Sequence, residues 1–94
     1  MRLVGQKLLT DFAKAHADAR SPLQTWTAEV EDARWLAQQD VMARYPQTSF
    51  LRDRIAVFNI KGNSYRLVAQ ISFKNGIVHV QRVGTHSEYD TWTL

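Results

Sequence analysis

The sequence has 94 residues, a net charge of +3 and no cysteine. This length suits one domain with a modest core, and without cysteine neither disulfides nor thiolate metal sites can form. No apolar run approaches the roughly 20 residues of a membrane-spanning helix, and the first residues lack the hydrophobic stretch of a signal peptide. We therefore expect a single domain over residues 1–94, in the cytoplasm and not at a membrane.

The excess positive charge lies in the second half of the chain. Residues 1–50 carry six basic and six acidic side chains, whereas residues 51–94 carry six basic and three acidic ones. A basic half suits a polyanionic partner such as RNA, or an acidic protein segment. A basic surface without any ligand explains the charge equally well, so charge alone does not identify the partner.

The first half of the chain predicts two or three helices. Residues 2–4 form a candidate strand, and apolar side chains then recur at helical spacing to about residues 17–20. A second helix with a buried apolar face is predicted over residues 21–37. A short third helix is predicted over residues 41–45, with Asp40 as its cap and a proline directly after it.

The second half of the chain predicts strands, because its apolar periodicity changes to two. The predicted strands are residues 54–60, 65–73 and 77–83. Asn75-Gly76 favours a type I′ hairpin turn, and Gly62-Asn63 is a second candidate two-residue turn. The predicted fold class is α+β, with two or three N-terminal helices packed on one face of a small antiparallel β-sheet.

The two turns set a strand register, which assigns residues to the two faces of the sheet. In this register Asn59 pairs with Arg66, and Arg66 pairs with Thr85, so that the three form a row on one face. The opposite face is the predicted core: Phe58, Leu67, Ala69, Ile71, Phe73, Val78 and Val80. Arg82 points toward the helices, so either it reaches solvent along the sheet edge or a bulge shifts the end of its strand.

The row around Arg66 carries the residue types that RNA cleavage requires. RNA can be cut without a metal ion by its own 2′-hydroxyl, provided that protons are moved and the phosphorane charge is stabilised. Arg66 can grip two phosphate oxygens, His86 follows the last strand, and Tyr89 lies one helical turn later, where it can stack on a base or donate a proton. Each also has an ordinary structural interpretation, as a solvated arginine, a surface histidine or a tyrosine that packs the C-terminus.

Neighbouring residues leave further alternatives open. Glu88 and Asp90 can orient His86, hold Arg66 or cap a terminal helical turn. His86, Glu88 and Asp90 also form a weak candidate metal set that would share a face only in an extended strand. We expect no metal and no other cofactor. Lys61-Gly62-Asn63 is a basic turn that can meet a phosphate, although a tight hairpin turn explains it as well.

Two sequence motifs resemble the HigB branch of the RelE-like toxins. They are FNIKGNSYRLV, residues 58–68, and GTHSEYD, residues 84–90. An N-terminal set also lies at family-like spacing: His16-Ala17-Asp18-Ala19, Leu23, Trp26 and Ala33-Arg34-Trp35. The resemblance therefore spans nearly the whole chain, and it implies a RelE-like fold.

The resemblance also implies cleavage of mRNA, usually in the ribosomal A site and without a metal. It implies a cognate antitoxin, typically a helix-turn-helix DNA-binding protein. The toxin would contact operator DNA only indirectly, through this antitoxin. The implied catalytic residues, matched by motif, are Arg66, His86 and Tyr89. The candidate substrate-binding residues are Lys61, Asn63, Asn59 and Arg82.

The sequence therefore predicts a metal-independent mRNA endonuclease toxin. Two alternatives remain open at this point. In the first, the same basic face binds RNA, the ribosome or a partner without cutting. In the second, the chain is a metal nuclease that uses His86, Glu88 and Asp90.

Overall fold

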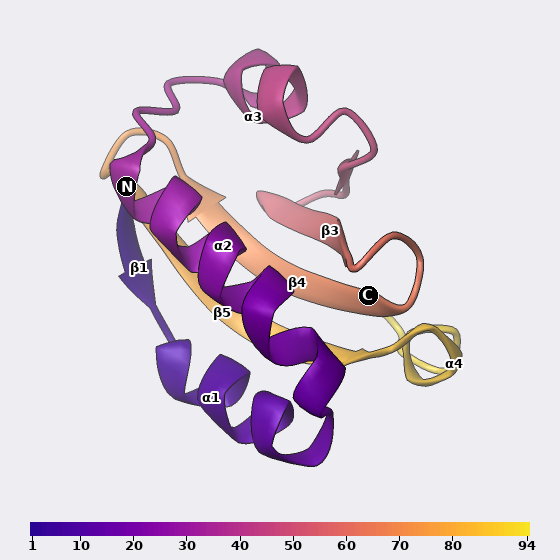
Figure 1. Cartoon of the computed structure of the whole chain (residues 1–94). Coiled ribbons are helices and arrows are strands. Elements are labelled where there is room, and N and C mark those ends of the chain that lie inside the picture. The colour runs from indigo at the N-terminus through magenta and orange to yellow at the C-terminus, as the bar shows by residue number, and fades with distance from the viewer.

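The computed structural model describes all residues, 1–94, and contains one sheet in the order β1-β5-β4-β3-β2 (Figure 1). The strands are β1 (Arg2–Val4), β2 (Ser49–Phe50), β3 (Ile55–Ile60), β4 (Tyr65–Ser72) and β5 (Ile77–Thr85). The predicted α+β class is confirmed, and β3 to β5 are the three predicted strands. The sheet is mixed because β1 lies parallel to β5, whereas the other pairs are antiparallel.

The helices lie on both sides of this sheet. They are α1 (Gln6–Ala15), the 3-10 helix η1 (Ala17–Ala19), α2 (Arg20–Asp32), α3 (Gln38–Arg44) and α4 (His86–Tyr89). Figure 1 shows α2 crossing one face of the sheet, with α1 beside it and α4 near the turn that joins β3 to β4. None of these helices combines the length and the apolar character needed to cross a membrane.

The second helix differs from its prediction at both ends. It begins at Arg20 rather than Ser21, because η1 runs directly into it and no side chain caps it. It ends well before residue 37, and Leu36 in the following segment is 79% exposed. Asp40 caps the third helix from within its first turn, where its carboxylate accepts the main-chain N–H of Leu36 at 2.8 Å.

The helix side of the sheet holds a hydrophobic cluster of 16 buried residues. The ring of Phe58 lies in its centre, 5.3 Å from the ring of Trp26 and 5.5 Å from that of Tyr45. The predicted core positions are buried in this cluster, except that Phe73 is only partly buried. Burying one such apolar side chain contributes roughly 1.5–3 kcal/mol, so this face determines which side of each strand points away from the helices.

The strand register confirms one predicted pair and corrects the other. Asn59 pairs with Arg66 as predicted, whereas Arg66 pairs with Gly84 and not with Thr85. Thr85 pairs instead with Tyr65, which belongs to the helix-side cluster. The row that faces away from the helices is therefore Asn59, Arg66 and Gly84.

The first cause of this shift is the loop between β4 and β5. Ser72 pairs with Ile77, so the loop has four residues rather than the predicted two. A type I′ turn needs two successive residues with positive φ, but Asn75 is not among the residues with positive φ. Gly76, at φ 68°, is the residue of this loop in the left-handed region.

The second cause is a β-bulge in β5. Val68 pairs with Arg82 while Ala69 pairs with Val80, so the residue between Val80 and Arg82 has no partner. An extra residue on one strand reverses the facing of everything beyond it. The bulge therefore turns Arg82 away from the helices and onto the face of Arg66, which is the second of the two alternatives that the sequence left open.

Candidate active site

Arg66 and Tyr89 lie together on the sheet face opposite α1 and α2. The guanidinium carbon of Arg66 is 5.7 Å from the centre of the Tyr89 ring, a cation–π distance. One nitrogen, Nη1, donates to the main-chain oxygens of Asn63, at 3.1 Å, and Tyr65, at 3.3 Å. The other guanidinium N–H groups make no hydrogen bond within the chain. They can therefore bind an oxyanion in the bidentate manner that suits arginine and phosphate.

Tyr89 belongs to α4, which a reciprocal cap attaches directly to the end of β5. The Thr85 hydroxyl accepts the main-chain N–H of Glu88 at 3.1 Å, and the Glu88 carboxylate accepts that of Thr85 at 2.8 Å. The hydrogen bond from the Thr85 N–H lowers the pKa of the Glu88 carboxyl. Of the roles considered for Glu88, the structure assigns it the cap, so the helix starts at a fixed place and angle.

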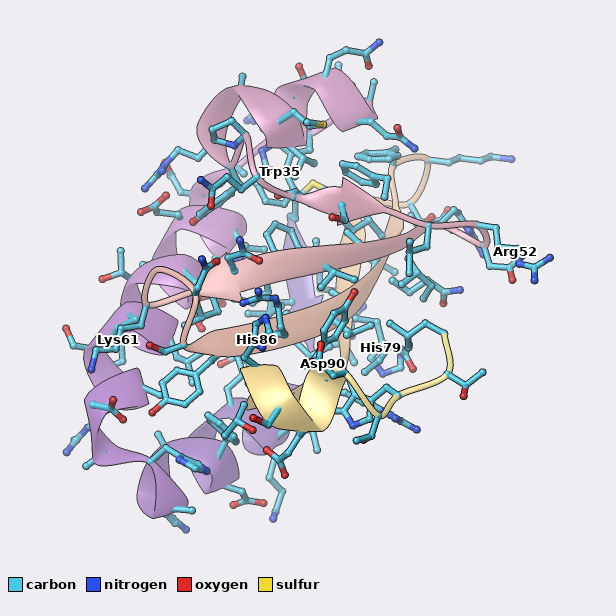
Figure 2. The ribbon with its side chains drawn as sticks, turned by 90° about the vertical axis from the view of Figure 1, so that its right-hand side faces the viewer. Trp35, Arg52, Lys61, His79, His86 and Asp90 are labelled. Carbon is cyan, nitrogen blue, oxygen red and sulfur yellow. The ribbon has the colours of Figure 1, made fainter.

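His86 is the first residue of α4, and both its main chain and its ring have partners within the chain. Its N–H donates to the Ser64 oxygen at 3.1 Å, which joins α4 to the turn between β3 and β4. Its Nδ1 lies 3.5 Å from a carboxylate oxygen of Asp90. Both side chains are about half exposed, and Figure 2 shows them in front of the sheet. Asp90 is placed to orient the ring, while Nε2 makes no hydrogen bond within the chain.

A second cation–aromatic pair extends this site along the sheet. The guanidinium carbon of Arg82 is 5.2 Å from the Trp92 ring centre, and the Trp92 ring meets the edge of the Tyr89 ring at 5.9 Å. Arg66, Tyr89, Trp92 and Arg82 thus form one continuous group, which we call the cation–aromatic row. Such a row suits a nucleic-acid strand, since aromatic faces stack with bases and arginines bind phosphates.

Sequence reasoning missed Trp92 and Gly84 as members of this site. Trp92 lies beyond the GTHSEYD motif, and only a C-terminal segment that folds back over the sheet brings it to Arg82. Gly84 leaves the space that the Trp92 ring fills. A glycine inside a strand often marks a bulge or a close approach, and this was the signal in the sequence that could have identified the position.

The predicted substrate-binding residues are distributed over two places. The side chain of Asn59 is joined to that of Asn63 at 3.4 Å and to that of Gln47 at 3.2 Å, next to Arg66. Lys61 is elsewhere: its ammonium is 2.7 Å from the Asp18 carboxylate, and Figure 2 shows it beside the N-terminal helices. The structure therefore brings Asn59, Asn63 and Arg82 near Arg66 but does not bring the Lys61 ammonium there.

The acidic residues of the C-terminal motif are not gathered into a metal-binding set. Glu88 is engaged in the cap, whereas Asp90 faces His86. No group of three or more His, Asp or Glu side chains in the chain is arranged to hold a metal ion. The donor arrangement thus offers no support for the metal-nuclease alternative.

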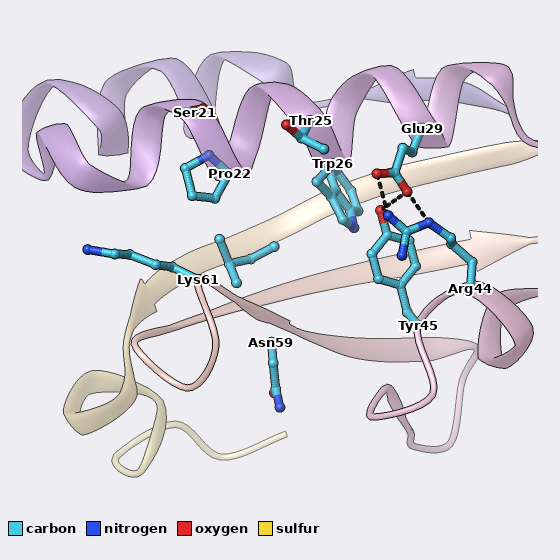
Figure 3. Close-up of a pocket in the computed structure, with 10 residues that line it drawn as sticks. Ser21, Pro22, Thr25, Trp26, Glu29, Arg44, Tyr45, Asn59 and Lys61 are labelled. Carbon is cyan, nitrogen blue, oxygen red and sulfur yellow. Dashed lines mark hydrogen bonds and ion pairs between the residues drawn. The ribbon is translucent and has the colours of Figure 1, made fainter.

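A cavity of about 370 Å³ lies elsewhere, between α2, the end of α3 and the edge of β3 (Figure 3). At one end of the cavity the Glu29 carboxylate accepts hydrogen bonds from the Arg44 guanidinium and the Tyr45 hydroxyl. Burial of Tyr45, together with its hydrogen bond to Glu29, raises the pKa of the Tyr45 hydroxyl. The indole N–H of Trp26, which also lines the cavity, is buried without a partner. Asn59 and Lys61, two of the predicted substrate-binding residues, line this cavity, whereas none of the predicted catalytic residues Arg66, His86 and Tyr89 does.

The sequence profile of the HigB toxin family, described as the RelE-like toxic component of a toxin–antitoxin system, matches residues 19–92. The match covers most of the chain, and the chain belongs to this family. As the toxic component of such a system, it has an antitoxin as its partner.

Curated relatives agree with this assignment. The chain is similar to the mRNA interferase toxin HigB of Escherichia coli K12, with 28% identity over 95 residues that cover 99% of this chain and 91% of the relative. The mRNA interferase HigB proteins of Escherichia coli O157:H7 and Shigella flexneri match it to the same extent.

Proposed function

We propose that this toxin is an endoribonuclease that cleaves mRNA without a metal ion. The observation that carries the proposal is the cation–π pairing of Arg66 with Tyr89, which belongs to the short helix that begins at His86, in a member of the HigB toxin family. The relatives named as mRNA interferases support the same activity. Arg66 can bind the phosphate, Tyr89 offers an aromatic surface for a base, and His86 supplies a ring that can take up or release a proton.

The reaction is a transesterification within the RNA. The 2′-oxygen attacks the adjacent phosphorus as its proton passes to a base, the bond from phosphorus to the 5′-oxygen breaks, and an acid protonates that oxygen. His86 and Tyr89 divide the two proton transfers. The free N–H groups of Arg66 stabilise the charge that grows on the non-bridging oxygens. The products are a 2′,3′-cyclic phosphate, or the 3′-phosphate formed from it, and a 5′-hydroxyl.

The RNA lies along the cation–aromatic row in this proposal. Tyr89 stacks on a base next to the scissile phosphate, while Asn59, Asn63 and Arg82 contact the strand on either side. Lys61 was also a substrate-binding candidate, and its ammonium forms an ion pair with Asp18.

The biological context of the proposal follows the family resemblance. The substrate is mRNA in the ribosomal A site, in the cytoplasm. The antitoxin is a helix-turn-helix protein that represses the shared operon, so the toxin contacts operator DNA only through it.

Induced expression tests the proposal in cells. The toxin is expected to arrest growth, and Arg66→Ala or His86→Ala to relieve the arrest. Arg52→Ala is the matched control for Arg66→Ala, because Arg52 is an exposed arginine far from His86 in Figure 2. Equal toxicity of Arg66→Ala, His86→Ala and the parent would remove the site assignment.

Purified protein tests the chemistry. Ribosomes programmed with a synthetic mRNA are incubated with the toxin, and the ends of the fragments are mapped. We expect 5′-hydroxyl ends and cleavage that survives EDTA. New 5′-phosphate ends, or cleavage abolished by EDTA, would contradict the mechanism. Binding to RNA or ribosomes without any fragments would support the non-catalytic alternative.

A further inference from the structure

The turn between β3 and β4, residues 61–64, holds the two halves of the proposed active site. The main-chain oxygen of Asn63 accepts a hydrogen bond from the Arg66 guanidinium at 3.1 Å. The next oxygen, that of Ser64, accepts the main-chain N–H of His86 at 3.1 Å. The position of this one turn therefore sets both the guanidinium and the start of α4.

The turn has an unfavourable backbone conformation and needs support from elsewhere. Lys61 and Gly62 both lie in the left-handed region, at φ 51° and φ 62°. Glycine adopts this region readily, whereas a residue with a side chain does so at a cost. Within the turn's own backbone, the Ser64 N–H donates a hydrogen bond to the Lys61 oxygen at 3.1 Å.

The support comes from one carboxylate in the helical layer. Asp18, in η1, accepts a hydrogen bond from the Lys61 ammonium at 2.7 Å through one oxygen and a hydrogen bond from the Tyr65 hydroxyl through the other. Lys61 is the first residue of the turn and Tyr65 directly follows its last, so the Asp18 side chain holds the turn at both ends. These two hydrogen bonds lower the pKa of the Asp18 carboxyl, and the bond from Lys61 has the larger effect.

The segment that leads into Asp18 packs against Phe12 and Tyr65 through the ring of His16. His16 stacks on Phe12 with ring centres 4.3 Å apart and meets the edge of the Tyr65 ring at 5.5 Å. Asp18 belongs to the family-like segment 16–19, and its two partners, Lys61 and Tyr65, belong to the FNIKGNSYRLV motif. The proposed nuclease mechanism uses no residue of segment 16–19, although this segment contacts the FNIKGNSYRLV motif through Asp18.

We propose that Asp18 is a positioning residue of the active site, which clamps the 61–64 turn so that Arg66 and His86 keep their relative placement. Lys61 then acts through Asp18, and its ammonium does not contact an RNA phosphate. This inference rests on the proposed nuclease function for its catalytic consequence. The clamp itself is a property of the fold that can be measured without any cleavage.

Kinetics of four variants test the catalytic part. Asp18→Asn and Lys61→Met are expected to lower kcat by about tenfold or more with little change in KM, since misplacing reacting groups by about 1 Å can cost on the order of 10²-fold. The double variant is expected to be no worse than either single one, because both remove the same contact. Asp11→Asn is the matched control, since Asp11 makes a similar exposed ion pair with Lys7 at 2.8 Å.

The salt dependence of RNA affinity separates the two roles of Lys61. A lysine that binds a phosphate of single-stranded RNA contributes about 0.7 to the slope of log affinity against log salt. We expect Lys61→Met to leave this slope unchanged. A slope reduced by that amount, together with additive effects of Asp18→Asn and Lys61→Met on kcat, would overturn the proposal.

Magnetic resonance tests the clamp independently of activity. In Asp18→Asn we expect the Arg66 side-chain Nε–H signal to shift and the His86 amide to exchange faster with solvent, while Asp11→Asn changes neither. Thermal unfolding of each variant shows that the fold persists. Unchanged signals in Asp18→Asn would refute the clamp. If the parent protein cuts no RNA but these signals move, the nuclease proposal fails and the clamp stands.

Discussion

Gly84 lies directly against the indole ring of Trp92. A Cβ atom at position 84 would be 2.7 Å from Cζ2 and 2.9 Å from Cη2 of that ring, closer than carbon atoms approach without displacement. Gly84 does not have a positive φ, so the backbone there would accept another residue. The glycine is required by the Trp92 ring and not by the chain conformation.

Gly84→Ala is therefore expected to displace Trp92 and, through it, Tyr89. The Trp92 ring belongs to a segment near the C-terminus and can move, so the cost in stability should stay near the lower end of the roughly 1–3 kcal/mol of an overpacked site. The rate of mRNA cleavage should fall clearly even though the protein remains folded. Thermal unfolding and cleavage of ribosome-bound mRNA measure the two effects, and a variant with full activity would show that Trp92 does not support the site.

Trp92 also offers a direct signal of RNA binding. The other two tryptophans, Trp26 and Trp35, are only 2% and 6% exposed, whereas Trp92 is half-buried beside Arg82. Stacking of a base on an aromatic side chain is worth about 1–3 kcal/mol, so Trp92→Ala should weaken RNA binding by about tenfold or more. We expect RNA to quench the fluorescence of the parent protein and to leave that of Trp92→Phe unchanged. Equal quenching in both would place the RNA away from the cation–aromatic row.

Much of this architecture follows from local sequence signals. The period-two pattern of β3 and β4 and the turn between them were sufficient to pair Asn59 with Arg66 correctly. These signals are local, because a hairpin fixes its register through its own loop and its own alternation. The helix-side core was predicted for the same reason.

The remaining part of the site depends on contacts that local signals do not contain. The bulge before Arg82 and the four-residue loop after Ser72 each shift the register of β5. Asp18 and Lys61 meet across 43 residues of sequence. Such placements depend on how the layers pack, which explains why Thr85 was predicted in the row where Gly84 lies and why the ion pair between Lys61 and Asp18 was not predicted.

The Glu29 carboxylate in Figure 3 gives the protein a component of acid sensitivity. The hydrogen bond from Arg44 has the largest effect in lowering the pKa of the Glu29 carboxyl in the folded state, and the hydrogen bond from Tyr45 lowers it further. Because the folded pKa lies below the unfolded value of about 4.3, the stabilisation is present above that value and is lost as the pH falls through the folded pKa. Glu29→Gln should therefore flatten the dependence of the unfolding temperature on pH below about pH 5. Parallel melting curves for parent and variant over this range would contradict the assignment.

Glu88 and Asp90 separate the metal-free mechanism from its metal-dependent rival. Glu88 caps α4 and Asp90 faces the His86 ring, so each contributes to placing His86 and neither touches RNA in the proposed mechanism. Glu88→Gln, which keeps an acceptor for the Thr85 N–H, should retain most activity, and Asp90→Asn should lower kcat less than His86→Ala does. A metal nuclease that used these carboxylates as ligands would instead lose its activity in both variants and regain part of it with added Mn²⁺. Cleavage assays of the three variants, with and without Mn²⁺ and EDTA, decide between the mechanisms, since the first predicts no response to either addition.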